Sequence, residues 1–249
     1  MNSTIETILN HRSIRKFTDE PLTEEQIQLI VESAQAASTS SFVQAYTIIG
    51  VKNHEKKKKL AELAGNQSYV ENNGHFFVFC ADLNRHEMAA ELEGKDMPAS
   101  LETTETFMVA LIDAALASQN AVLAAESMGL GACYIGGIRN NLEEVQQVLK
   151  TPKRVLPLFG IAIGYPMQES SKKPRLPFSN IYHEDEYQQD TNLFKQQLEE
   201  YNQEISSYYH ERTGGKRNDT WTAQMTNMMQ APKRTYMKDY INKQGLSLK

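Results

Sequence analysis

Apolar positions repeat at helical spacing near the N-terminus. Ser3 and Glu6 are spaced as a capping box at the start of a short apolar face made of Ile5, Ile8 and Leu9. Thr23 and Gln26 have the same spacing and precede a second apolar face, which consists of Ile27, Ile30, Val31 and Ala34. The pattern therefore predicts two amphipathic helices, separated by a turn-like stretch.

Short continuous apolar runs replace this spacing farther along the chain. Four of them are partly β-branched or aromatic and have turn-forming residues at their ends, which predicts buried strands at residues 46–51, 76–81, 132–135 and 158–163. The longest helical pattern covers about residues 103–128 and ends at Gly129. Its many alanines let neighbouring backbones approach closely. We therefore expect a central buried helix, which also suits the seam of a dimer.

The composition changes after Gly164. Proline, lysine and arginine punctuate residues 166–189, which predicts an extended arm, and residues 190–249 are polar with a mostly helical pattern. We expect an α+β fold in a single domain over residues 1–249, with a core at 1–165, the arm, and a helical C-terminal extension.

The composition also limits the classes of function. With 249 residues and a formal net charge of -5, the chain is long enough for one large core and too acidic for a dedicated nucleic-acid binder. No uninterrupted apolar run is long enough for a membrane span, and the N-terminus lacks the pattern of a secretion signal. Cys80 and Cys133 lie inside apolar runs, as buried free thiols do. These features predict a cytoplasmic protein.

Four polar segments are candidates for binding a ligand. Residues 11–15 hold two arginines, a histidine and a hydroxyl, a donor set that suits phosphate, although a helix C-terminus also favours cations. The other segments are a hydroxyl run at 38–41, a strand-to-glycine junction at 134–137 and a proline-stiffened cationic stretch at 172–177. The hydroxyls also suit local backbone hydrogen bonds, and the glycines also suit a plain turn.

Several familiar chemistries have no signature in this sequence. It contains no glycine motif for dinucleotides or phosphates, no nucleophile elbow, no evident catalytic triad and no metal-ligand spacing. We therefore assign no catalytic side chain and no metal. A bound organic cofactor that carries the reaction itself explains an enzyme of this kind.

The order of motifs along essentially the whole chain is more specific than any one of them. The motifs are residues 11–15, 38–42, 65–67, 79–82, 125–131, 134–137, 157–160 and 173–177. Together they resemble the NADPH-dependent, oxygen-insensitive nitroreductase and flavin reductase family, in its major-enzyme branch. The resemblance implies an α+β sandwich, with a mainly antiparallel central sheet flanked by helices, and an intertwined homodimer that binds FMN non-covalently at its interface.

The resemblance also implies which residues hold the cofactor. The FMN phosphate is expected to bind two segments that contain His11, Arg12, Ser13 and Ile14, and Lys173, Pro174 and Arg175. Arg15 is expected on the pyrimidine side of the flavin ring and Gln67 at its polar edge. Backbone groups at the end of a strand are expected near flavin N5 and O4, in the segment Tyr134, Ile135, Gly136 and Gly137. Contacts from the partner chain are expected from Ser38, Thr39 and Ser40.

The same resemblance implies the reaction. NADPH reduces the flavin and leaves, and free FMN, a quinone or a nitroaromatic then takes its place, which gives ping-pong kinetics. The 2′-phosphate of NADPH is expected at a glycine-containing loop with Arg212 and Arg217, and Arg15 is also expected to face this co-substrate. Residues 88–106 match no family motif and are expected to line or cover the substrate side.

Other functions stay open at this point. Nitro or quinone detoxification as the main role keeps the same chemistry. A flavin carrier without turnover belongs to another class, although the C-terminal extension is more than a small carrier needs. A nucleic-acid-binding module is disfavoured by the acidic balance.

Overall fold

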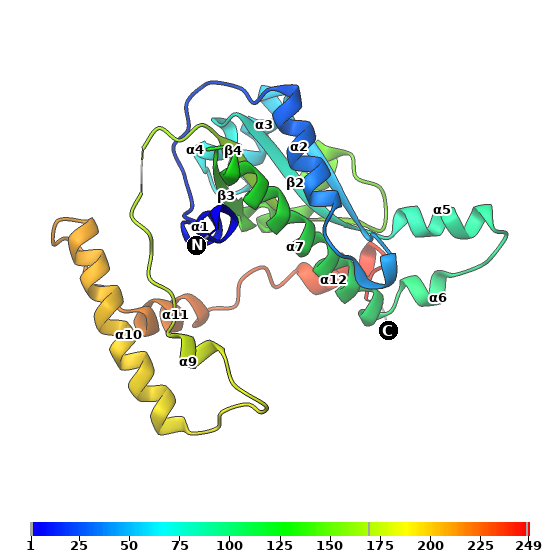
Figure 1. Ribbon diagram of the computed structural model, residues 1–249. Coiled ribbons are helices and arrows are strands. Elements are labelled where there is room, and N and C mark those ends of the chain that lie inside the picture. The colour runs from blue at the N-terminus through cyan, green and yellow to red at the C-terminus, as the bar shows by residue number, and fades with distance from the viewer. Residues whose placement is uncertain (1, 169, 248) are drawn as a thin grey trace. The chain divides into compact units, whose positions relative to one another are not determined.

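The computed structural model describes residues 2–168, 170–247 and 249, apart from the side chain of Pro98, and divides into two compact units (Figure 1). The first unit comprises Met1–Ser170 and Arg234–Lys249, and the second comprises Ser171–Lys233. The chain thus leaves the first unit after the sheet is complete and returns to it for the last helix.

A four-stranded antiparallel sheet is the centre of the first unit. In the spatial order β1-β2-β4-β3, its strands are β1 (Tyr46–Val51), β2 (His75–Asp82), β4 (Val155–Gly164) and β3 (Gly131–Ile135). Every residue of β2 is buried, and its side chains alternate between two apolar cores. Phe77 and Phe79 face one core, and Phe76 and Val78 face the other. The four predicted strands and the antiparallel sheet are confirmed.

Helices cover both faces of this sheet (Figure 1). The first core lies under two packed helices, α2 (Glu24–Gln35) and α7 (Thr104–Ser127), and is completed by α12 (Met237–Lys243). The second core is covered by α3 (His54–Leu63), α4 (Ser68–Glu71) and α8 (Leu142–Leu149). The predicted sandwich of a sheet between helical layers is therefore confirmed.

The central helix matches its prediction. α7 buries Phe107, Asp113, Ser118, Val122 and five alanines within the first unit. Small side chains at these positions let α7 pack closely on α2 and the sheet. Among the described residues, α7 is the one helix with the length and apolar character of a membrane span. The face that it packs against α2 and the sheet instead identifies it as a core helix.

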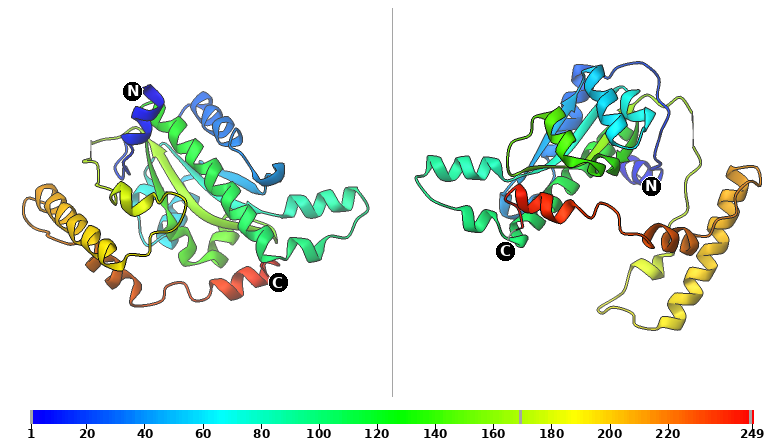
Figure 2. Two further views of the ribbon diagram at one scale, coloured as in Figure 1. Left: turned by 60° about the horizontal axis from the view of Figure 1, so that its bottom comes forward. Right: turned by 180° about the vertical axis from the view of Figure 1, so that it is seen from behind.

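Shorter elements complete the first unit. α1 (Ser3–Leu9) packs on α7, and two 3-10 turns are η1 (Ser40–Phe42) and η2 (Gly136–Asn140). After β2, the chain forms a projecting helical pair, α5 (Asn84–Leu92) and α6 (Pro98–Leu101) (Figure 2).

One of the two predicted capping boxes forms. The Thr23 hydroxyl accepts the Gln26 N–H at 3.1 Å, and the Gln26 side chain accepts the Thr23 N–H at 3.0 Å. The box predicted at Ser3 and Glu6 is wrong. Asn2 caps this helix instead, because its side chain accepts the Ile5 N–H at 3.0 Å and leaves Ser3 inside the first turn.

The second unit is a small helical assembly of α9 (Phe178–Ile181), α10 (Thr191–Arg212) and α11 (Trp221–Met229). Asp190 caps α10 by accepting the N–H groups of Asn192 and Leu193. Its buried core is Tyr201, Ile205 and Tyr209, with partly buried neighbours Leu176, Tyr208 and Trp221.

Candidate functional site

The cationic segment at residues 11–15 is fixed along the edge of β3. Ser13 forms a parallel bridge with Ala132, and the Ile14 N–H donates to the Ala132 carbonyl at 3.0 Å. The Ile14 side chain fills the space above Gly131, where a Cβ would lie 2.7 Å from it. The buried isoleucine thus anchors a backbone from which Arg12 and Arg15 extend.

His11 is oriented by a carboxylate that sequence reasoning did not assign. Its Nδ1 lies 2.6 Å from Oε1 of Glu126, near the end of α7. Glu126 and Arg12 also line a groove of about 710 Å³ between α1, the start of β3 and residues 166–168. Because 115 positions separate His11 from Glu126, no local spacing revealed the pair.

Tyr69 joins two residues that were predicted to contact the same ligand. Its hydroxyl donates to Oε1 of Gln67 at 2.6 Å, and the charge of Arg15 acts on the same phenol. Burial raises the pKa of Tyr69, and the charge of Arg15 opposes that rise. Sequence reasoning missed Tyr69, although it stands two positions after Gln67.

The glycine junction packs against the segment that carries Gln67. A Cβ on Gly137 would lie 2.3 Å from the Ala64 carbonyl oxygen, and the Gln67 side chain donates to the same oxygen at 2.9 Å. Gly137 therefore lacks a side chain for close packing, a reason that the sequence did not distinguish from ligand approach. Gly136 precedes it directly. The structure thus brings Arg15, Gln67 and the glycine pair together.

Two predicted contact residues offer only their backbone. Ile14 and Ile135 are buried in the second core, so their side chains are not available to a ligand. Tyr134 is 37% exposed, and its hydroxyl lies 3.0 Å from the Ser118 hydroxyl on α7. Burial raises the pKa of Tyr134, and its hydrogen bond with Ser118 opposes this rise.

The hydroxyl run lies on a different part of the first unit. Ser38 and Ser40 are exposed and Thr39 is half-buried, in a loop that follows α2. The hydrogen bonds of this loop go to α7 and α5, whereas residues 11–15 lie along β3. A buried aspartate, Asp113, holds the loop on α7, and sequence reasoning missed it.

The predicted residues of the arm belong to the second unit and rest on α10. Lys173 Nζ donates to the Tyr209 hydroxyl at 2.9 Å, and the Pro174 carbonyl accepts the Tyr201 hydroxyl at 3.0 Å. Burial acts to raise the pKa of Tyr209, but the hydrogen bond and charge of Lys173 outweigh it and lower that pKa. Burial raises the pKa of Tyr201, and the nearby charge of Arg175 opposes it.

Two of the three arginines predicted to bind NADPH, Arg212 and Arg217, lie on tyrosine rings. The Arg212 guanidinium carbon is 5.7 Å from the centre of the Tyr208 ring, and Arg212 donates to its hydroxyl. Arg217 lies 4.3 Å from the centre of the Tyr209 ring and also pairs with Asp219 at 2.6 Å. Tyr209 therefore contacts both Lys173 and Arg217.

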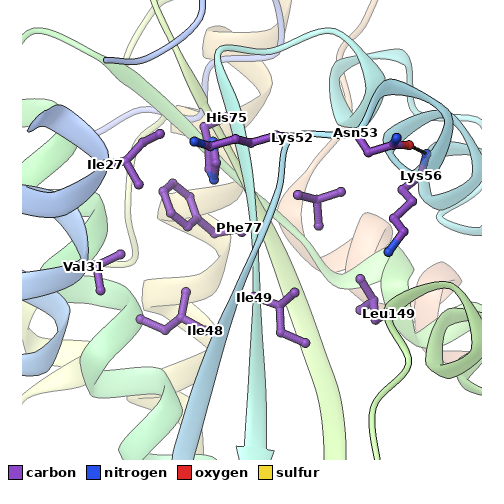
Figure 3. A pocket seen from close by; sticks show the side chains of 12 residues that line it. Ile27, Val31, Ile48, Ile49, Lys52, Asn53, Lys56, His75, Phe77 and Leu149 are labelled. Atoms are coloured by element: carbon purple, nitrogen blue, oxygen red, sulfur yellow. Dashed lines mark hydrogen bonds between the residues drawn. The ribbon is translucent and has the colours of Figure 1, made fainter. Parts of the chain in front are cut away.

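A second cavity, of about 450 Å³, lies at the open edge of β1 (Figure 3). Its walls are mainly apolar, with Ile27 and Val31 from α2 and Phe77 from β2. Burial and the charges of Lys52 and Lys57 lower the pKa of His75, which also lines this cavity, to about 4. None of the residues predicted to bind cofactor or NADPH lines it.

Known proteins resemble this chain in sequence along nearly its whole length. The model of the nitroreductase family matches residues 8–165, and that of the nitroreductase family, C-terminal domain, matches residues 173–249. The chain is 60% identical over 247 residues to a Bacillus subtilis protein named FMN reductase (NADPH), covering 99% of each chain. It is 41% identical to an oxygen-insensitive NADPH nitroreductase of Salmonella typhimurium, covering 98% of each.

A solved structure shows the same fold at high identity. The structure of NfrA1 from Bacillus megaterium superposes with a TM-score of 0.98 at 65% identity, covering 99% of this chain and 100% of that one. The match extends through the sheet, the residues 11–15 segment and the helical second unit. The chain therefore belongs to the nitroreductase family.

Proposed function

We propose that this chain is an NADPH-dependent oxidoreductase that binds FMN non-covalently and reduces free FMN, nitroaromatics and quinones. The cluster of Arg15, Tyr69, Gln67 and Gly137 carries this proposal, because residues far apart in sequence gather where a flat ring would meet a cation, an amide and a backbone. The names of the Bacillus and Salmonella relatives support NADPH as the electron donor.

The donor set fits the phosphate of FMN. A phosphate monoester carries nearly two negative charges at neutral pH, so its binding needs several cations. We assign His11, Arg12, Ser13, Lys173 and Arg175 to this group. Glu126 fixes the His11 ring, and Tyr209 holds Lys173 through a hydroxyl, which leaves the ammonium charge available to an anion.

The remaining residues suit the ring and the ribityl chain. When bound, FMN supplies a ring that accepts hydride in a ping-pong cycle between NADPH and the acceptor. We assign Arg15 to the pyrimidine side, because a positive charge there stabilises a reduced anionic ring. Gln67 and the backbone at Gly136 and Gly137 face its polar edge. The remaining assigned residue with an available side chain is Tyr134. Three further residues contribute backbone groups to the FMN site: Ile14, Ile135 and Pro174.

The loop after α10 is assigned to the 2′-phosphate of NADPH. Arg212 and Arg217 rest on tyrosine rings, which orient the guanidinium groups without burying them. Gly214 and Gly215 follow with positive φ values of 59° and 82°, as a chain reversal at a helix end requires.

We further propose that the whole chain forms one FMN-binding domain and works as a homodimer, with Ser38, Thr39 and Ser40 reaching the cofactor of the partner. Met108, Ile112 and Leu116 form an exposed apolar stripe along α7, which supports a contact with a second copy. Sedimentation equilibrium should give about twice 28.2 kDa. A stable monomer that carries FMN would contradict this. Two buried free cysteines support a cytoplasmic location.

The function is tested by purifying the protein and measuring its flavin and its turnover. We expect a yellow protein that releases about one FMN per chain on heating and oxidises NADPH steadily when an acceptor is present. FMN binding without NADPH oxidation would favour the carrier. Values of kcat/KM for free FMN, a quinone and a nitroaromatic would rank the acceptors. If the nitroaromatic ranks first, the result favours nitro detoxification as the main role, in agreement with the name of the Salmonella relative.

A further inference from the structure

A fully buried carboxylate lies in the middle of the alanine-rich helix α7. Asp113 is 0% exposed, and its neighbours on the buried face of the helix include Ala110 and Ala114. Its Oδ1 accepts the Ser40 N–H and its Oδ2 accepts the Ala45 N–H, both at 3.0 Å. A charge in such surroundings is costly unless it is hydrogen-bonded. Both oxygens of this carboxylate are committed to one loop.

That loop has an unfavourable backbone conformation. Between the two N–H groups that Asp113 holds, Ser41, Phe42 and Gln44 have positive φ values of 48°, 60° and 54°. Residues other than glycine adopt this region at a cost in free energy, and they stay there only when the surrounding structure enforces it. The loop nevertheless presents the Phe42 ring to solvent, at 80% exposure.

Side chains of helix α5 bind the carbonyl groups of the same loop. His86 Nε2 donates to the Val43 carbonyl at 2.8 Å, and Arg85 donates to the Gln44 carbonyl at 3.3 Å. Asp113 holds the complementary N–H groups from the other side. The loop is therefore fixed through both donors and acceptors of its backbone, although most of its side chains are exposed.

We propose that Asp113 is a positioning residue for flavin binding. It holds the loop at residues 39–45 in its strained conformation, so that Ser40 and Phe42 are already placed for the FMN of a second subunit. This inference rests on the proposed function, in which Ser38, Thr39 and Ser40 contact that FMN. A loop that is ordered before binding loses less conformational entropy when the ligand arrives.

The first test replaces Asp113 and measures FMN affinity. Asp113→Asn keeps the volume, but an amide can accept only one of the two N–H groups. We expect the Kd of the apoprotein for FMN, from quenching of flavin fluorescence, to rise about 10-fold or more, as loss of one charge-assisted hydrogen bond predicts. We also expect the visible absorption bands of the bound flavin to change shape.

Asn120→Ala is the matched control. Asn120 lies on the same helix and donates to the Ser33 carbonyl on α2 at 3.1 Å, away from the clamped N–H groups. This variant should lower Tm yet leave the Kd for FMN within about 2-fold. A role of Asp113 in stability alone predicts that both variants lower Tm and that neither changes the FMN Kd or the flavin spectrum.

A second pair of variants changes Ser40, the residue that donates the N–H to Asp113. Ser40→Pro removes the N–H that Asp113 accepts, whereas Ser40→Ala keeps it, and both lose the hydroxyl. Proline is tolerated at the first residue of a short helix, and Thr39 already has the extended conformation that precedes proline, with φ of -125° and ψ of 152°. We expect FMN to bind at least about 5-fold more weakly to Ser40→Pro than to Ser40→Ala.

The outcomes separate this inference from the proposed function. Wild-type protein that binds no FMN would overturn both. Wild-type protein that binds FMN, together with equal Kd values in Asp113→Asn and Asn120→Ala, would overturn only the role of Asp113. If Asp113→Asn does not fold, the Ser40 pair decides, and equal affinities of Ser40→Pro and Ser40→Ala would reject the inference.

Discussion

The two units use their cations differently. In the first unit, two cations outside the candidate site pair with carboxylates: buried Arg154 contacts Glu87 at 3.2 Å and Glu102 at 3.4 Å, and Lys59 contacts Glu144 at 3.2 Å. In the second unit, Lys173 and Arg212 contact tyrosine hydroxyls and rings. Carboxylates neutralise a cation, whereas tyrosines orient it and leave its charge for an anion. The first arrangement holds the fold together, and the second suits the binding of phosphate.

The two units also differ in the size of their apolar cores. The first unit has two extended apolar cores on the faces of the sheet, and the core of the second consists of three buried side chains, Tyr201, Ile205 and Tyr209. Buried apolar area is the main source of stability, so the second unit is expected to open at a lower free energy than the first. Low local stability suits a segment that binds and releases a co-substrate.

The largest expected effect tests this difference in stability directly. Ile161 on β4 and Ile205 on α10 are both 0% exposed. Ile161→Ala should lower the free energy of global unfolding by about 2–5 kcal/mol, because it leaves a cavity in the larger core. Ile205→Ala should change global unfolding by less than about 1 kcal/mol and instead speed proteolysis within residues 171–233. Urea denaturation and limited proteolysis measure the two effects, and equal losses of global stability would contradict the comparison.

The next effect concerns a histidine of the first unit. Burial lowers the pKa of His75 from 6.5 to about 4, so the folded protein keeps it neutral while the unfolded chain gains a proton as the pH falls. The stability that depends on His75 is therefore complete above about pH 6.5 and is lost progressively toward pH 4, by about 3 kcal/mol. His75→Phe should remove this slope from urea unfolding curves measured at pH 7, 6, 5 and 4.

The control for that slope comes from the second unit. His210 is exposed on α10, so His210→Phe should leave the pH dependence of unfolding unchanged. A slope that persists in His75→Phe would show that other groups cause the acid sensitivity.

A smaller effect tests the cations of the second unit. Losing one charge-assisted contact of roughly 1.5–3 kcal/mol should raise KM for NADPH by about 10- to 150-fold in Arg212→Ala. Arg217→Ala should lose less, because Asp219 already neutralises part of its charge. NADH lacks the 2′-phosphate and should respond far less. Lys59→Ala, at a paired cation of the first unit, should leave KM for NADPH and KM for NADH unchanged. Equal increases in KM for both nicotinamides in Arg212→Ala would reject the assignment.

The smallest effect isolates one tyrosine hydroxyl. Tyr209→Phe keeps the ring beneath Arg217 and removes the oxygen that holds Lys173. We expect FMN affinity to fall by about 2- to 10-fold, as the loss of a single orienting hydrogen bond predicts, with KM for NADPH nearly unchanged. Tyr240→Phe, in the core of the first unit, should lower Tm without changing FMN affinity. A larger loss of FMN affinity in Tyr240→Phe than in Tyr209→Phe would contradict the proposed orientation of Lys173.

The sequence predicted the elements that local rules determine. Continuous apolar runs with β-branched or aromatic residues located the strands, and helical spacing located α7. The fourth strand was predicted at residues 158–163, with Pro157 as a turn-forming boundary. The structure begins β4 at Val155, and a register shift between Phe79 and Cys80 accommodates Pro157 opposite Cys80. That accommodation depends on the neighbouring strand.

The candidate site was predictable where one segment carries a motif and not where distant residues meet. Residues 11–15 stood out by their charge density. The carboxylate of Glu126 and the phenol of Tyr69 became visible only in the fold, because they act on His11 and Arg15 from other elements. Asp113 was not predicted, because it is a single carboxylate among the alanines of a helix whose pattern is mainly apolar.

The proposed binding of the FMN phosphate by Arg12 and Arg175 has a direct test. Arg12→Ala combined with Arg175→Ala should give largely colourless protein, with FMN content falling from about one per chain to below about 0.1, because two charge-assisted contacts are lost. A control that combines Lys59→Ala with Lys243→Ala, two cations paired with carboxylates in the first unit, should stay fully yellow. Full FMN occupancy in the Arg12 and Arg175 double variant would show that these residues do not hold the phosphate.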